Sequence, residues 1–285
     1  MKIVILSDIH GNYKALQKCL DHAFRQNVDS YIFLGDYLGE FPYPQKTLQI
    51  LYDMRNNYSC FFLRGNKEDY WINRRKNINC DWKNGNHSIM AMLNNYENLQ
   101  SEDIDFFESL PISRVLAFDG TEPILICHGT PSANNRTLLP DDEKFSETIH
   151  QYREKYIICG HTHIRGIVFD GEKKIFNAGS VGVPLNSPKK TQYLILTSDG
   201  REWNPEFFSL EYDVDAVIKE LHDSGLWDKT PYWCMITEHL LLTGKPSHGT
   251  ALRHVMKLNG YKDPWYCIDA SYWEKALFDM GIIQE

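Results

Sequence analysis

Five short apolar runs in the first 160 residues are predicted to be buried strands. Each run is rich in β-branched or aromatic residues and stops abruptly at a glycine or a polar residue, which is typical of buried strands. The five runs are Lys2–Ser7, Tyr31–Leu34, Cys60–Leu63, Ile124–Cys127 and Tyr156–Cys159.

Helices are predicted between the first three of these strands. In the first gap, apolar residues recur at helical spacing: Ala15, Leu16, Cys19, Leu20 and Ala23. Asn12, just ahead of them, is expected to cap that helix. In the second gap, Pro44 is expected to open a helix that carries Leu48 and Leu51. This alternation predicts parallel strands joined by right-handed crossovers.

Beyond Gly160 the pattern changes to antiparallel hairpins. Asp-Gly pairs at 170–171 and 199–200 separate alternating runs, and such pairs are typical of tight hairpin turns. The flanking runs are Ile164–Phe169 with Lys173–Phe176, and Tyr193–Thr197 with Glu202–Leu210. From Asp213 the spacing is helical again, and Gly225 is expected to end that helix. The shift predicts a core over residues 1–210 and a helical cap or extension over residues 211–285.

Polar side chains follow all five predicted strands. The segments are Asp8-Ile9-His10, Gly35-Asp36, Arg64-Gly65-Asn66, His128-Gly129 and Gly160-His161-Thr162-His163. Because the carboxyl ends of parallel strands converge on a ligand crevice, we expect seven side chains to meet there. These are Asp8, His10, Asp36, Asn66, His128, His161 and His163.

Four imidazoles, two carboxylates and one amide in one place are better explained by cations than by mutual hydrogen bonding. Seven side chains are too many for one tetrahedral ion and suit two ions about 3.5–4 Å apart. Without thiolates the set is no closed structural zinc site, and mixed nitrogen and oxygen ligands suit manganese, iron, nickel or zinc. Alone, Asp8 or Asp36 would be an ordinary turn residue and His128 a core or loop histidine. The joint pattern predicts a dinuclear metal site.

Composition and charge narrow the function further. The chain has 285 residues, with 30 Lys and Arg against 38 Asp and Glu, a formal charge of −8. This balance disfavours binding to nucleic acid or to an anionic membrane, and a nucleotide or polyphosphate substrate would need a local positive site. The apolar runs are far shorter than the roughly 20 residues of a membrane span, and the N-terminus does not resemble a signal peptide.

The seven cysteines form no CxxC pair and no regular spacing. They lie at positions 19, 60, 80, 127, 159, 234 and 267. An odd and scattered set of this kind indicates free thiols in a reducing compartment. We therefore expect a cytoplasmic protein.

At the five strand ends the chain resembles the calcineurin-like metallophosphoesterase superfamily. The matching motifs are Asp8-x-His10, Gly35-Asp36-x-x-Gly39, Gly65-Asn66-x-Glu68, His128-Gly129 and Gly160-His161-x-His163. The segment from Asn177 to Gly182 also resembles the Asn-Pro-Gly-Ser segment of the small bacterial phosphodiesterase branch, with Ala178 where proline is usual. The resemblance covers about residues 1–205.

The resemblance implies a four-layer α-β-β-α sandwich, here with a C-terminal helical extension, and a set of roles. One ion would be held by Asp8, His10 and His163, and the other by Asn66, His128 and His161. Asp36 would bridge the two divalent ions, for which manganese is favoured. A hydroxide between the ions would attack phosphorus in line, with Asp36, Asn66 and Lys67 expected as catalytic residues.

Position 67 departs from the family pattern, because many relatives have histidine there to protonate the leaving oxygen. Lys67 is expected to contact a phosphate oxygen, with the alternatives that it is the general acid or that it points to solvent. Asn12 and Arg64 are further substrate-binding candidates. Asn12 is also explained by its capping role, and Arg64 is equally well explained as a solvated loop charge.

The leading hypothesis is a metal-dependent phosphoesterase that acts on phosphodiesters or other small phosphorylated compounds. An asymmetric dinucleoside-polyphosphate hydrolase is the alternative, in which aromatic residues of the C-terminal segment would stack on a base rather than only pack together. These residues are Trp227, Tyr232, Trp233, Trp265, Tyr266, Tyr272 and Trp273. A non-catalytic, metal-containing scaffold is an alternative of another class. The oligomeric state stays open.

Overall fold

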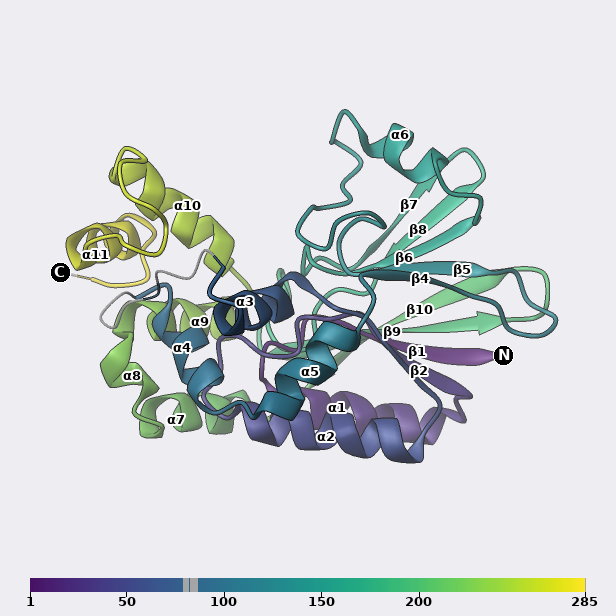
Figure 1. The fold of residues 1–285 in the computed structure, drawn as a ribbon, viewed down its shortest axis with the longest axis horizontal. Helices are drawn as coiled ribbons and strands as arrows, with labels where there is room; N and C mark the ends of the chain where they lie inside the picture. Colours follow the sequence, from purple (N-terminus) through teal and green to yellow (C-terminus); the bar gives the residue numbers. More distant parts are fainter. Residues whose placement is uncertain (79–81, 83–86, 285) are drawn as a thin grey trace.

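The computed structural model describes residues 1–78, 82 and 87–284, and in this part of the chain the strands form two five-stranded sheets (Figure 1). The first sheet has the order β10-β9-β1-β2-β3 and the second has the order β4-β5-β6-β8-β7. The strands are β1 (Lys2–Leu6), β2 (Ser30–Phe33), β3 (Cys60–Phe62), β4 (Ser113–Leu116), β5 (Ile124–Cys127), β6 (Tyr156–Cys159), β7 (Gly166–Asp170), β8 (Lys173–Asn177), β9 (Lys190–Ser198) and β10 (Trp203–Glu211).

The predicted parallel strands are found in both sheets. In the first sheet β1 pairs with β2 and β2 with β3 in parallel, with Ile5 opposite Ile32. In the second sheet β5, β6 and β8 are parallel neighbours. All of these strands therefore point their carboxyl ends the same way within their sheet, which is the edge where the polar motifs follow.

The helices lie outside the sheets and in a separate C-terminal group. Their bounds are α1 (Tyr13–Ala23), α2 (Pro44–Asn57), α3 (Asn66–Arg75), α4 (Met90–Glu97), α5 (Ser101–Ser109), α6 (Phe145–His150), α7 (Val214–Asp223), α8 (Leu226–Lys229), α9 (Pro231–Thr243), α10 (His248–Leu258) and α11 (Ala270–Asp279), with a short 3₁₀ helix at Phe24–Gln26. Asn12 caps α1 by accepting a hydrogen bond from the backbone of Ala15, and Pro44 opens α2, as the sequence predicts.

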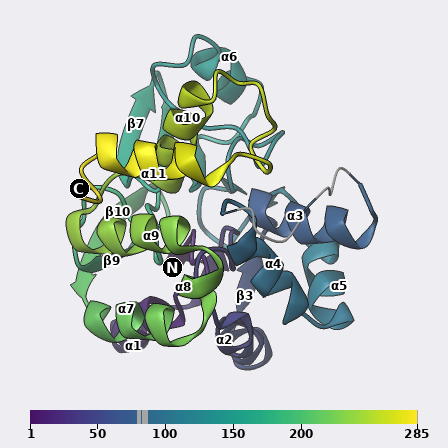
Figure 2. The ribbon, with the colours of Figure 1, turned by 90° about the vertical axis from the view of Figure 1, so that its left-hand side faces the viewer.

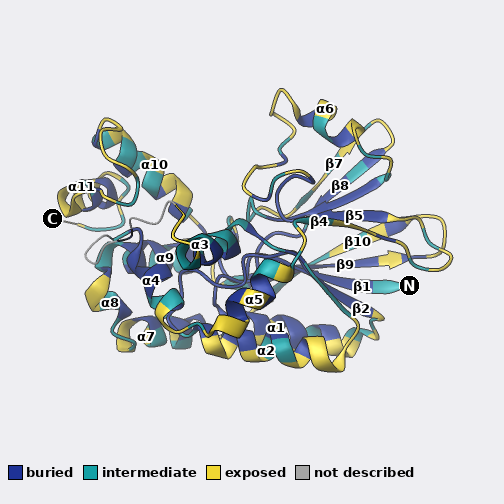
Figure 3. Cartoon of the chain, in the orientation of Figure 1, coloured by how far each residue is buried: buried dark blue, intermediate teal, exposed yellow. Residues whose placement is uncertain are grey.

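The layers follow from where the apolar side chains point. Ile3, Ile5 and Ile32 of the first sheet pack against Ile158 and other residues of the second sheet, so the two sheets share one apolar layer. Helices α1 and α2 cover the outer face of the first sheet, and α6 covers the outer face of the second (Figure 1). The four-layer α-β-β-α sandwich is therefore confirmed, with the strands mostly buried (Figure 3).

Both predicted hairpins form, with small shifts in their turns. Asp170 pairs with Lys173, so Gly171 and Glu172 make the two-residue loop rather than Asp170 and Gly171. The second hairpin turns over four residues, 199–202, because Asp199 Oδ1 accepts hydrogen bonds from the backbone of Arg201 and Glu202. The antiparallel edge strand β4 was not predicted, since its partly exposed Ser-Arg-Val-Leu sequence lacks an apolar pattern.

The C-terminal helices α7–α11 gather at one end of the molecule (Figure 2). They enclose an apolar cluster of their own that contains Trp233 and Trp273, while Trp265 and Tyr266 pack against the apolar cluster that lies under α1 and α2. The rings considered for base stacking are thus largely engaged in packing. The boundary near residue 210 falls at the end of β10 and stays a prediction.

Two further observations concern the whole described chain. No helix in residues 1–78 and 87–284 is long and apolar enough to span a bilayer. The described cysteines are free thiols, and Cys80 lies outside the described residues.

Candidate metal centre

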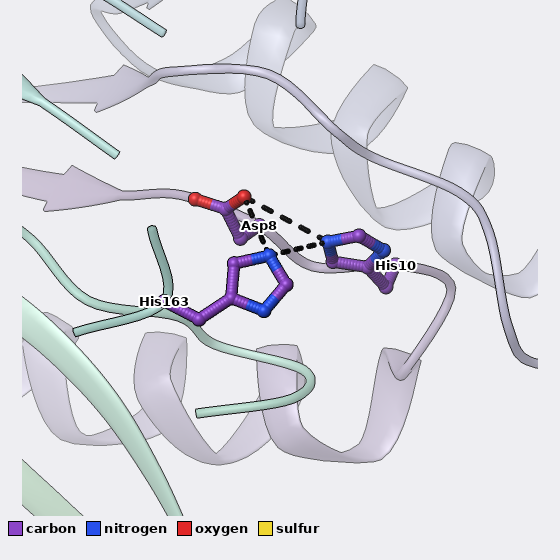
Figure 4. A group of neighbouring side chains, drawn as sticks. All are labelled: Asp8, His10 and His163. Atoms are coloured by element: carbon purple, nitrogen blue, oxygen red, sulfur yellow. Dashed lines mark hydrogen bonds and ion pairs between the residues drawn. The ribbon is translucent and has the colours of Figure 1, made fainter. Parts of the chain in front are cut away.

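Asp8, His10 and His163 form one compact group of possible metal ligands at the end of β1 (Figure 4). Nε2 of His163 lies 3.1 Å from Oδ1 of Asp8 and 3.1 Å from Nε2 of His10. Nε2 of His10 lies 3.7 Å from Oδ1 of Asp8. One carboxylate oxygen and two ring nitrogens thus face a common point.

A second group of possible ligands is formed by Asp36, His128 and His161, at the ends of β2, β5 and β6. Nε2 of His128 lies 3.4 Å from Oδ1 of Asp36. The amide oxygen of Asn66, the first residue of α3, lies 3.2 Å from the same nitrogen. The structure therefore brings all seven predicted ligands together in two adjacent groups.

Asp36 lies between the two groups. Its Oδ1 faces His128, while its Oδ2 lies 3.7 Å from Nε2 of His10 in the first group. One carboxylate oxygen is therefore directed toward each group, which is the arrangement expected for a carboxylate shared by two ions.

The backbone at the site is strained. Asp8, His10, Asp36, His161 and His163 all have positive φ, between 54° and 65°. Residues other than glycine seldom adopt this left-handed region, and residues that do so gather at functional sites. The left-handed backbone turns these side chains away from the strand direction and toward one another.

Glycines permit the close approach of the ligand loops. A Cβ on Gly160 would lie 2.7 Å from Oδ2 of Asp8 and would collide with the hydroxyl of Ser7. A Cβ on Gly65 would collide with the carboxylate and backbone of Asp36. At both positions the neighbouring loop lies too close for a side chain, so the Gly-His and Gly-Asn motifs require glycine there.

The ring orientations leave Nε2 available on two of the histidines. Nδ1 of His10 lies 2.5 Å from Oε2 of Glu40, and Nδ1 of His128 donates to the carbonyl oxygen of Leu34 at 3.1 Å. Partners of this kind fix the tautomer and orientation of metal-binding histidines.

Burial and neighbouring charges shift the pKa values of the ligands. Burial alone would lower the pKa of His10, but the carboxylates of Glu40 and Asp8 raise it to about 10. The pKa of His128 is likewise raised to about 9 against burial, by Asp36 and Asp8. Burial opposes ionisation of Asp36, yet His128 and His10 lower its pKa to about 2. Each of these carboxylates and imidazoles therefore stabilises the charged form of its neighbours.

The remaining polar atoms fit a bound cation. Asp8 Oδ2 accepts hydrogen bonds from the hydroxyl of Ser7 at 2.5 Å and from the backbone of His161 at 2.9 Å. Its Oδ1 is buried and makes no hydrogen bond of good geometry. A buried carboxylate oxygen without a partner is costly unless an ion or another group compensates it. Together with the nitrogen and oxygen donors around it, this atom fits a divalent ion.

A comparison with known protein families identifies the superfamily of this chain. A family model described as the calcineurin-like phosphoesterase superfamily domain matches residues 1–201. The chain belongs to the calcineurin-like phosphoesterase superfamily. The resemblance stated from the motifs is confirmed, and members of this divalent-metal-dependent family are phosphoesterases.

Several known proteins are similar to this chain in sequence or in fold. An uncharacterized protein of Methanocaldococcus jannaschii is 25% identical over 248 residues, covering 81% of this chain and 94% of that protein. A hypothetical protein of Pyrococcus horikoshii has a similar fold, with a TM-score of 0.71, 17% identity and coverage of 86% and 99% of the two chains. A metallophosphoesterase from Sphaerobacter thermophilus has a TM-score of 0.67, 22% identity and coverage of 85% and 100%.

Lys67, where many calcineurin-like phosphoesterases have histidine, turns inward in this chain. Its Nζ lies 2.9 Å from Oε1 of Glu40, and its side chain is only 15% exposed. Burial alone would lower the pKa of Lys67, but the carboxylates of Glu40 and Asp36 raise it. The charged side chain of Lys67 is therefore paired with Glu40 beside the ligand groups and does not extend into solvent.

Asn12 and Arg64 are both engaged by the protein itself. Asn12 is buried, and its Nδ2 donates to the carbonyl oxygen of Gly182 and to the hydroxyl of Tyr212, each at 3.0 Å. Arg64 is half-buried, and its Nε lies 3.1 Å from Oδ1 of Asp69. Their role in substrate binding stays a prediction.

Two acidic residues of the site were not singled out by the sequence analysis. Glu40 holds His10 and Lys67, as described above. Glu68 is fully buried and accepts hydrogen bonds from the backbone of Asp36, Tyr37 and Gly65 at 2.8–2.9 Å. Glu68 thereby ties the loop after β2 to the start of α3. Its place in the Gly-Asn-x-Glu motif was the available signal, whereas nothing in the sequence pointed to Glu40.

Proposed function

We propose that this protein is a dinuclear metal-dependent hydrolase that cleaves phosphodiesters or other small phosphorylated compounds. The observation that carries the proposal is Asp36, whose two oxygens face separate ligand groups. When bound, two divalent ions, with manganese favoured, would supply a nucleophile at neutral pH and neutralise charge on the phosphoryl oxygens.

The residues of the chain have distinct proposed roles. Asp8, His10 and His163 hold one ion, and Asn66, His128 and His161 hold the other. Asp36 joins both. Because Lys67 is charged and lies beside the ligand groups, it would attract a phosphoryl oxygen of the substrate. As a poor proton donor it favours substrates with good leaving groups, such as aryl phosphates or phosphate anhydrides.

The test is a metal analysis combined with turnover. The full chain is loaded with manganese, and bound metal is counted before hydrolysis of bis-p-nitrophenyl phosphate and p-nitrophenyl phosphate is measured. We expect about two ions per chain and hydrolysis of at least one compound, and we expect Asp36→Asn to lose both metal and turnover. Two bound ions without turnover of these compounds or of a nucleotide panel would support the scaffold alternative instead.

A nucleotide substrate is the second candidate. The aromatic C-terminal segment motivated it, and those rings mostly pack within the protein. The candidate now depends on a positive site for additional phosphates.

A further inference from the structure

A cavity of about 390 Å³ opens in the segment that joins β5 to α6. Its lining combines hydroxyl groups, two cations and apolar side chains: Thr130, Ser132, Arg136, Lys144, Leu138 and Phe145. Pockets of a few hundred Å³ with an apolar surface and a few polar groups are typical of small-molecule sites. None of these residues belongs to the two ligand groups.

The segment that lines the cavity begins directly after a candidate metal ligand, His128. Thr130 follows His128 by two positions, and the segment folds back so tightly that a Cβ on Gly129 would collide with the carbonyl oxygen of Arg136. In the same segment, Asn134 Nδ2 donates to the carbonyl oxygen of Gly65 at 2.9 Å. Because Gly65 precedes Asn66, this segment is attached to a candidate ligand loop of the first sheet as well as to His128 of the second.

The two cations of the cavity are not used by the protein itself. Within residues 1–78 and 87–284, neither Arg136 nor Lys144 forms an ion pair with an acid. Asp142 also lines the cavity, and its Oδ1 accepts a hydrogen bond from the backbone nitrogen of Lys144 at 2.9 Å. On a chain with a formal charge of −8, two cations against the one carboxylate of Asp142 leave the lining with a net positive charge.

The floor of the cavity is apolar. Leu138 and Phe145 are buried, and both belong to the apolar cluster on the outer face of the second sheet. A floor of this kind can accept the uncharged part of a ligand, such as a sugar or base.

We propose that this cavity binds a second, non-reacting phosphoryl group of the substrate. Arg136 and Lys144 would contact its oxygens, with the hydroxyl group of Ser132 as a further donor. The inference rests on the proposed hydrolase function and narrows its substrates to compounds with more than one phosphoryl group, such as nucleoside and dinucleoside polyphosphates.

The test compares two substrates in the manganese-loaded full chain. Bis-p-nitrophenyl phosphate has one phosphorus atom, and diadenosine tetraphosphate has four. The double variant Arg136→Ala/Lys144→Ala removes the cavity cations. The matched control is Arg153→Ala/Lys257→Ala, which removes two exposed cations, one of them located before the amino end of β6.

We expect the double variant to lower kcat/KM for diadenosine tetraphosphate about tenfold, mainly through KM, because charged hydrogen bonds are lost. Its kcat/KM for bis-p-nitrophenyl phosphate should stay within about twofold, and the control should change neither. Equal losses on both substrates, or no loss on either, would overturn the inference. The inference would also be overturned if bis-p-nitrophenyl phosphate is hydrolysed while diadenosine tetraphosphate is neither hydrolysed nor inhibitory. That result would leave the proposed hydrolase function intact.

A binding measurement separates the inference from the hydrolase function. If neither compound is hydrolysed, the proposed function fails, and the affinity for ADP is measured by calorimetry on the same variants. About tenfold weaker ADP binding in the double variant alone would support the cavity as a phosphate site. Unchanged binding in the double variant would contradict it.

Discussion

The carboxylate of Glu40 joins His10 to Lys67, with one oxygen 2.5 Å from Nδ1 of the histidine and the other 2.9 Å from Nζ of the lysine. A candidate metal ligand, His10, and a candidate substrate contact, Lys67, therefore share the same buried anion. This link connects the first ligand group to the position where the chain departs from its family.

Replacing Glu40 should weaken the metal centre. Glu40→Gln keeps the shape but removes the charge that orients His10, so we expect manganese affinity to fall about 10- to 100-fold. Titration calorimetry with manganese measures this, and Glu97→Gln on the exposed end of α4 is the control. Unaltered affinity in Glu40→Gln would show that the His10 contact has no effect on the site.

Replacing Lys67 should affect turnover more than metal content. Lys67→Ala removes a cation but no ligand, so we expect kcat/KM for phosphate esters to fall about tenfold while two ions stay bound. Because Lys67 is proposed as an electrostatic contact, the loss should be similar across aryl phosphates with different leaving-group pKa values. A loss that grows with leaving-group pKa would identify Lys67 as the general acid.

Metal binding and stability should respond to pH in opposite directions. The pKa values of His10 and His128 are raised to about 10 and about 9, and a metal must displace their protons. Manganese affinity should therefore rise between pH 6.5 and 9, by about tenfold per pH unit for each displaced proton.

In the metal-free protein the same raised pKa values act on folding. The stabilisation by the charged histidines is complete below their unfolded pKa of about 6.5 and is lost as pH rises through the folded values. Chelator-treated protein should thus lose stability from pH 7 toward pH 10 in denaturant titrations. An increase in its stability over that range would contradict the predicted charge state.

A methyl group at Gly160 should disrupt the centre. Gly160→Ala places Cβ against Ser7 and Asp8, so we expect loss of metal and destabilisation by about 1–3 kcal/mol. Gly166→Ala is the matched control, because a Cβ there has open space and an ordinary backbone. Equal behaviour of the two variants in thermal unfolding and metal analysis would show that the crossing at Gly160 tolerates a side chain.

The parts of the site that the sequence predicts are those attached to buried strands. Apolar runs such as Ile124–Cys127 are visible in sequence, and the sheet then brings the residues after them to one edge, so the seven ligands could be found. Glu40 and Glu68 could not be found in this way, because one lies in a loop, the other in the first turn of a helix, and neither follows a strand directly. The role of Glu40 and Glu68 is to contact residues of neighbouring loops, and the sequence does not show which loops are neighbours in the fold.

The outer elements were harder to predict for a related reason. Strand β4 is a partly exposed edge strand, and α4 has little amphipathic pattern to distinguish it. In the C-terminal segment, aromatic residues suggested a stacking surface, yet Trp233 and Trp273 are buried among apolar neighbours. Sequence shows which rings are present, but tertiary packing determines which faces remain free.

The two ligand groups each combine residues from both sheets, since Asp8 and Asp36 follow strands of the first sheet and His128 and His163 follow strands of the second. The distance between the candidate ligand atoms of the two sheets therefore depends on the thickness of the shared apolar layer, which includes Ile5 and Phe176. Substitutions that change the packing of this layer would therefore change the affinity for metal, so the amount of bound metal reports on the packing of the core.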